Sequence, residues 1–153
     1  MMKPTKGEAR IHIDAPPEKV YAAITDVTRM GEWSPECQRA EWLGGATEAT
    51  VGARFKGSNK RGRMKWSTKP EVTAADPGRE FAFKTPQTQW SYRLAASNGG
   101  TEVVESYNVY KLPPALIGWF FSTMAGIKDR DAELQVDMQQ TLSRLKAAVE
   151  GSA

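Results

Sequence analysis

The sequence predicts an α+β fold, in which a curved antiparallel sheet of about seven strands packs against a long C-terminal helix. Three observations lead to this prediction. An alternating segment near the N-terminus precedes two short helical segments, the middle of the chain carries frequent turn signals, and residues 129–149 are amphipathic with helical spacing. A sheet with one apolar face needs a covering layer, and only the C-terminal segment is long enough to supply it. With 153 residues, the chain is expected to form one domain.

The N-terminal part predicts one strand followed by two short helices. Residues 9–13 alternate apolar and polar side chains, as in a half-buried strand. Pro16 and Pro17 end this strand and suit the first turn of a helix. The apolar face of that helix is formed by Val20, Ala23, Ile24 and Val27. A second short helix is expected from Thr28 to Trp33, before Pro35.

A β-hairpin is predicted around Asn98-Gly99, because these two residues tolerate the positive φ values of a two-residue type I′ turn. The turn fixes a register, since pairing Ser97 with Gly100 determines every later pair. The pairs that this register places on one face of the sheet are Leu94 with Val103, Tyr92 with Glu105, and Trp90 with Tyr107.

Two further strand regions are predicted upstream. Asp76-Pro77-Gly78-Arg79 is typical of a turn and is expected to join two strands. The first of these strands carries Met64, Trp66 and Val72, and the second carries Phe81 and Phe83. Another strand is expected from Gly52 to Gly57.

The C-terminal part begins with a densely apolar segment, Leu112 to Ile127, which is interrupted by two prolines and two glycines. We expect it to be buried or to act as a lid beside a cavity entrance. The helix expected from Asp129 to Val149 has an apolar stripe at spacings of three and four residues. The stripe consists of Leu134, Met138, Leu142, Leu145 and Val149.

Composition excludes several classes of protein. The chain has one cysteine, Cys37, and one histidine, so an internal disulfide and a Cys/His metal site are not expected. No cofactor is expected either, because phosphate loops and dinucleotide fingerprints are missing from the sequence. The N-terminus lacks the apolar region of a signal peptide, and no stretch suits a bilayer-spanning helix, so a soluble, cytoplasmic protein is expected.

The net charge of +3 conceals a basic stretch. Residues 54–69 contain seven cations and no acidic residue. Because Lys65 alternates with Met64 and Trp66, the simplest interpretation is the solvated back of a strand, and nucleic acid is not expected as a partner. The alternative is that the Lys60-Arg61 turn steers an anionic ligand, or makes transient contact with an anionic membrane surface.

The segment Ile13-Asp14-Ala15-Pro16-Pro17-Glu18-Lys19-Val20-Tyr21, followed by Thr25-Asp26-Val27 and Trp33, resembles the opening of the START-like or Bet v 1-like superfamily (SRPBCC). The resemblance is strongest to its bacterial polyketide cyclase/dehydrase and lipid-transport group. Trp42, residues 51–57, the Asp76 turn and the terminal helix follow in the same order. The resemblance implies a helix-grip fold with an apolar cavity between sheet and helix.

Candidate ligand contacts come from the predicted inner face of the sheet, the apolar segment and the C-terminal helix. For each aromatic residue taken alone, plain core packing is the competing interpretation. The candidates are Trp33, Phe55, Trp66, Phe81, Phe83, Trp90, Tyr92, Glu105, Tyr107, Phe120, Met124, Leu134 and Met138.

Glu105 is the one acidic side chain that the predicted register places on the inner face. A buried carboxylate needs a partner, so it bonds a tyrosine, meets a polar group of a ligand, or acts as a general acid or base. No second acid or histidine is positioned by the sequence to share proton transfer, so Glu105 is a weak catalytic candidate. His12 is expected to face solvent, and Cys37 to be a small buried thiol without a nucleophilic role.

The leading hypothesis is therefore binding or transport of a hydrophobic small molecule, lipid-like or aromatic, in an internal cavity. One alternative is a polyketide cyclase or aromatase in which Glu105, Tyr92 or Tyr107 moves protons. Another is a homodimer or a client-binding module that uses Leu112 to Ile127 as its contact surface, so both a monomer and a homodimer are compatible with the sequence.

Overall fold

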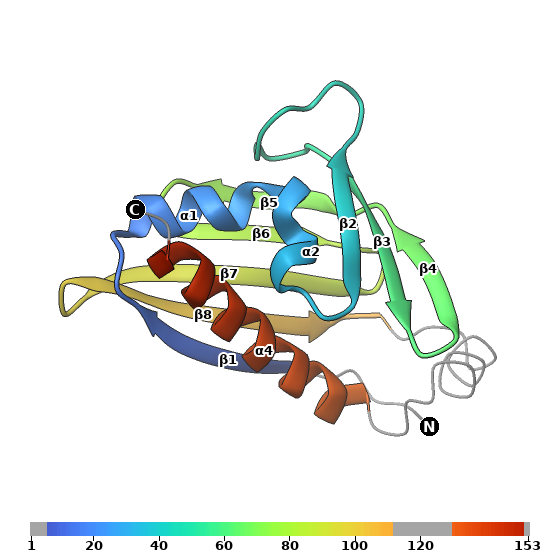
Figure 1. Ribbon diagram of the computed structural model, residues 1–153. Coiled ribbons are helices and arrows are strands. Elements are labelled where there is room, and N and C mark those ends of the chain that lie inside the picture. The colour runs from blue at the N-terminus through green and yellow to red at the C-terminus, as the bar shows by residue number, and fades with distance from the viewer. Residues whose placement is uncertain (1–5, 112–129, 152–153) are drawn as a thin grey trace.

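The computed structural model describes residues 6–111 and 130–151, which form eight strands and a set of helices (Figure 1). In chain order the elements are β1 (Lys6–Ile13), α1 (Pro17–Thr25), the 3-10 helix η1 (Val27–Arg29), α2 (Met30–Trp33), β2 (Cys37–Trp42), β3 (Phe55–Arg61), β4 (Met64–Thr68), β5 (Glu71–Asp76), β6 (Glu80–Lys84), β7 (Thr88–Ser97), β8 (Gly100–Val109) and α4 (Arg130–Gly151). None of the helices in this part of the chain combines the length and the hydrophobicity needed to cross a bilayer.

The strands form two antiparallel sheets that continue into each other. Five strands follow the order β1-β8-β7-β6-β5, and three follow β2-β3-β4. An isolated bridge between Arg54 and Glu71 joins the sheets, and the amide of Val72 donates to the carbonyl of Ala53 at 2.8 Å. The result is a curved sheet with α4 lying across it, while α1 lies toward one end and α2 lies between α1 and β2 (Figure 1). The predicted α+β, helix-grip architecture is confirmed.

The strand expected to run from Met64 to Val72 is in fact two strands. β4 ends at Thr68, β5 begins at Glu71, and the two belong to different sheets. Pro70 lies between them, and proline cannot donate to a strand ladder. This division explains why the structure has eight strands where about seven were predicted.

The strand expected from Gly52 to Gly57 is also displaced. β3 begins only at Phe55 and continues to Arg61. Gly52 has a φ of 92°, a left-handed conformation that belongs to a turn and not to a strand. The second short helix likewise begins later than expected, because Val27–Arg29 forms a 3-10 turn and α2 covers Met30–Trp33.

The β7–β8 hairpin has the register that its turn predicts. Ser97 pairs with Gly100, and Leu94, Tyr92 and Trp90 pair with Val103, Glu105 and Tyr107. Asn98 and Gly99 have φ values of 47° and 80°, as a type I′ turn requires. The inner face of the large sheet therefore carries the side chains that the sequence assigned to it.

Helix α4 covers both the apolar interior and the free edge of the sheet. The predicted stripe is buried, from Leu134 to Val149. β1 is an edge strand, and two of its carbonyls accept bonds from α4: Gln135 Nε2 donates to the Glu8 carbonyl at 2.9 Å and Lys146 Nζ to the His12 carbonyl at 2.8 Å. Covering an edge in this way prevents another strand from pairing with it.

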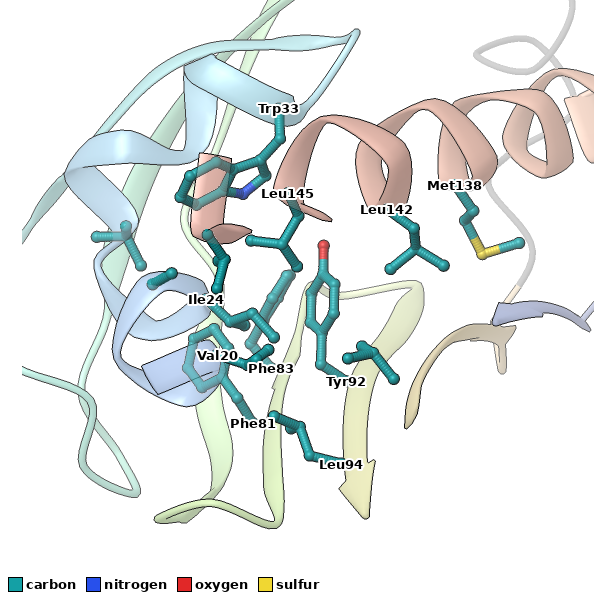
Figure 2. Packing of buried hydrophobic residues seen from close by; sticks show 14 of the residues in the cluster. Val20, Ile24, Trp33, Phe81, Phe83, Tyr92, Leu94, Met138, Leu142 and Leu145 are labelled. Carbon is teal, nitrogen blue, oxygen red and sulfur yellow. The ribbon is translucent and has the colours of Figure 1, made fainter. Parts of the chain in front are cut away.

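A chain of aromatic rings packs the small sheet against the large one. The ring of Phe55 on β3 contacts Trp42 at 5.7 Å and Phe83 on β6 at 5.2 Å, both edge to face. Phe83 also contacts Phe81 at 5.5 Å. Such pairs contribute about 0.5–1.5 kcal/mol each beyond the area that they bury. Figure 2 shows Phe81 and Phe83 beside Val20 and Ile24 of α1.

Candidate functional site

Glu105 lies at the centre of the candidate site, on the inner face of β8. It is paired with Tyr92 on one side and Ala9 on the other, and only 4% of its surface is exposed. The Tyr92 hydroxyl donates a hydrogen bond to the carboxyl group. The second carboxyl oxygen, Oε1, is buried and has no hydrogen-bond partner among the described residues. A buried oxygen without a hydrogen bond costs about 1–3 kcal/mol, so this oxygen lowers the stability of the folded protein.

Burial determines the protonation of this pair. Desolvation raises the pKa of Glu105 to about 8; the bond from Tyr92 opposes this shift, and the charge of Asp137 adds to it. Burial also raises the pKa of Tyr92 well above its usual value. At neutral pH Glu105 is therefore mostly a neutral carboxylic acid, which both donates and accepts hydrogen bonds.

A second polar group lies where α4 begins. Arg61, at the end of β3, binds the carboxylates of Asp137 and Glu133 on α4 and of Glu36 before β2. Arg61 Nη1 lies 3.2 Å from Glu133 Oε2, and Arg61 Nε lies 3.3 Å from Glu36 Oε2. The Arg61 side chain is 22% exposed. Lys60 and Arg61 were expected to form a turn, but both lie at the end of β3, and the turn follows at Gly62 and Arg63. Lys60 is exposed, whereas Arg61 turns inward and ties the small sheet to α4.

Tyr107 connects β8 to the first turn of α4. Its hydroxyl donates to Asp131, and its ring contacts Trp90 with a centroid distance of 5.5 Å. Together with Glu105, Tyr92 and Thr101, it places four polar side chains on a mainly apolar inner face. In Figure 2 the hydroxyl of Tyr92 points toward α4, in the direction of Leu142 and Leu145.

Most of the predicted contact residues lie in the interior. Trp66 and Trp90 are half-buried, and Phe120 and Met124 lie outside the described residues, as does the predicted lid or dimer contact at 112–127. The buried members are Trp33, Phe55, Phe81, Phe83, Tyr92, Glu105, Tyr107, Leu134 and Met138. Their role as ligand contacts stays a prediction.

Sequence reasoning missed the buried polar residues of α4. Asp137 and Thr141 are buried in the same stripe as Leu134, at spacings of three and seven residues from it. A polar residue in phase with an apolar stripe was the available signal. The partner of Asp137, Arg61, lies 76 positions earlier, and no local pattern connects the two.

The remaining reactive side chains fit ordinary structural roles. Cys37 is buried, its thiol donates to the Arg39 carbonyl at 3.3 Å, and burial raises its pKa to about 11, so little thiolate forms at neutral pH. His12 Nε2 lies 3.1 Å from Asp14 Oδ1 at the surface. Within residues 6–111 and 130–151, no three His, Cys, Asp or Glu side chains are grouped to hold a metal ion.

Two open hollows lie away from Glu105. One, of about 510 Å³, is formed on the small sheet and includes one predicted contact, Trp66. The other, of about 390 Å³, lies on the outer surface of α4 around Val136 and Gln139. Neither is lined by Glu105 or Tyr92, so the internal cavity beside these residues stays a prediction.

Comparison with known proteins supplies the family. Residues 4–150 match the family described as polyketide cyclase / dehydrase and lipid transport. The chain belongs to this family. Its START-like, Bet v 1-like resemblance is thereby confirmed. A search of curated proteins gave no match.

Solved structures show how widely the fold of the polyketide cyclase/dehydrase and lipid transport family is shared. TTHA0849 from Thermus thermophilus is 18% identical, with a TM-score of 0.74 over 97% of this chain and 99% of that chain. The di-domain ARO/CYC StfQ from the steffimycin biosynthetic pathway is 11% identical, with a TM-score of 0.76 over 97% of this chain and 51% of that chain. Ginseng major latex-like protein 151 from Panax ginseng is 14% identical, with a TM-score of 0.70 over 95% and 97%. At these identities the likeness establishes the fold alone.

Proposed function

We propose that the protein binds a hydrophobic small molecule between the curved sheet and α4, and that Glu105 and Tyr92 contact its polar group. The observation that carries this proposal is the buried Glu105 Oε1, which has no partner among the described residues. Buried polar atoms in folded proteins are nearly always satisfied, and those that are not often mark functional sites. A hydroxyl or carbonyl group of a ligand would supply the missing hydrogen bond.

The surroundings of Glu105 suit a hydrophobic ligand. Tyr92 and Tyr107 flank it along β7 and β8, and Met138 and Leu142 are buried on α4 above the sheet. Ligand pockets are typically apolar, with a few polar groups that fix orientation. The family description, which names lipid transport, supports the same class of ligand.

Native mass spectrometry of gently purified protein tests this proposal. We expect a co-purifying small molecule that dissociates on unfolding, and a smaller bound fraction in Glu105→Ala. Glu102→Gln is the matched control, because this residue lies on the outer face of the same strand with 42% of its side chain exposed. An unliganded protein that also binds no apolar probe in titration would contradict the proposal.

A second candidate function, cyclisation of a polyketide-like chain, is favoured by one observation. A carboxyl group whose pKa is about 8 exchanges protons readily near neutrality, and Tyr92 lies within hydrogen-bond reach of it. The Glu105 carboxylate would take a proton from the carbon between two carbonyls, and the resulting enolate carbon would attack a ketone. The Tyr92 hydroxyl would donate a hydrogen bond to the alkoxide that forms, and the protonated Glu105 would then return its proton to that alkoxide. Product analysis with a poly-β-keto thioester tests this, with loss of the cyclised product expected in Glu105→Gln.

A further inference from the structure

We infer that the ligand meets Glu105 with a neutral hydroxyl group, and that the site rejects a carboxylate on the same apolar skeleton. This inference rests on the proposed function and specifies the chemical class of the ligand. Two features of the described residues lead to it, namely the acidic side chains around Glu105 and the saturation of Arg61.

The first feature is the charge beside Glu105. Asp137 is close enough for its charge to act on the Glu105 carboxyl group, and it is 8% exposed. Asp131 accepts a bond from Tyr107 two positions along β8, and Glu133 lies between these aspartates on α4. Screening is weak at partly buried positions, so an added carboxylate would be repelled by these groups.

The second feature is that the guanidinium of Arg61 is already occupied. It binds Asp137, Glu133 and Glu36 together, through Nη2, Nη1 and Nε. A planar guanidinium is the preferred protein partner of a carboxylate because of its forked donors. Each of its three nitrogens already contacts a carboxylate, and the three carboxylates outweigh its single positive charge, so Arg61 offers a ligand carboxylate no net attraction.

A hydroxyl group avoids both difficulties. It donates to Glu105 Oε1 or accepts from the protonated carboxyl group, and it brings no charge into a site walled by Leu142, Leu145 and Tyr92. A protonated amine would be attracted by the nearby acidic residues, but Glu105 is mostly neutral and Asp137 is already paired with Arg61, so burying the ammonium charge there without its own partner costs more than burying a hydroxyl group.

The experiment compares three probes with one ring system and different head groups: 2-naphthol, 2-naphthoate and 2-naphthylmethylamine, titrated calorimetrically at pH 7. We expect 2-naphthol to bind at least tenfold more tightly than either charged probe. Asp137→Asn should lower the ratio of the 2-naphthoate Kd to the 2-naphthol Kd at least threefold. The substitution removes one repelling charge and frees donors of Arg61. Glu102→Gln removes the same charge from the outer face and should leave the preference unchanged.

The outcomes separate the two proposals. If 2-naphthoate or the amine binds as tightly as 2-naphthol, the charge inference is wrong and the proposed function stands. If Asp137→Asn folds normally, as its urea unfolding would show, and leaves the preference unchanged, the acidic residues do not select the ligand and the inference is also wrong. If none of the three probes binds, the proposed function fails and this inference fails with it.

Discussion

The β7–β8 and β3–β4 hairpins have similar turns but different interiors. Each turn has two residues, with Asn98 and Gly99 at positive φ in the first and Gly62, at φ 58°, in the second. The inner face of β7–β8 is covered by apolar residues of α4, and its one acidic side chain, Glu105, lies buried against them. The inner face of β3–β4 ends in Arg61, which three carboxylates hold. Turn geometry therefore sets the local register in both hairpins, whereas tertiary partners decide which polar groups are buried.

The largest expected effect concerns Glu105 on β8. Its pKa of about 8 in the folded protein lies above the ordinary value of 4.5, so between these pH values the unfolded chain releases a proton that the folded chain retains. Stability should therefore fall as the pH rises from 4.5 to 8 and then level off, a loss on the order of 3–5 kcal/mol from this residue. Urea unfolding at several pH values measures the free energy of unfolding of the wild type and of Glu105→Gln, and the wild type alone should show this loss. If the two free energies changed in parallel with pH, the Glu105 carboxyl group would not be buried as described.

The next effect concerns the ionic end of β3–β4. Arg61→Met should destabilise the fold by roughly 2–4 kcal/mol. This loss is smaller than the largest losses seen when a fully buried ion pair is broken, because the carboxylates that Arg61 binds are partly exposed. The neighbouring Lys60→Met, at an exposed position, should change stability by about 0.5 kcal/mol or less. Equal effects of the two substitutions in chemical denaturation would mean that Arg61 is an ordinary surface cation.

The smallest effect tests the similarity of the turns. Gly99→Val and Gly62→Val each force a β-branched residue into a left-handed conformation, at a cost of about 1–3 kcal/mol. A Cβ at Gly99 meets no other atom within 4 Å, so strain alone is measured there. Thermal unfolding should show losses of comparable size in the two variants. A much larger loss at one turn would indicate that this turn does more than connect its strands.

The two hairpins also differ in what their sequence reveals. In β7–β8, Asn98-Gly99 and strict alternation carry enough information to predict every pair, including Tyr92 with Glu105. In β3–β4, residues 54–69 contain only basic charges, so nothing local distinguishes the half-buried Arg61 from the exposed Lys60. The α4 stripe was predictable from its spacing, but its buried Asp137 was not, because an acid in an apolar stripe is stabilised only by a partner distant in sequence.

The most direct test of the central claim is methyl NMR of the protein titrated with 2-naphthol. The account predicts that the methyl signals of Met138, Leu142 and Leu145, which are buried on the side of α4 that faces Tyr92, shift in a saturable manner (Figure 2). Val136 lines the hollow on the outer surface of the same helix and is 54% exposed, so its methyl signals should stay unchanged. Shifts confined to Val136, with the three buried residues unaffected, would contradict a ligand site between the sheet and α4.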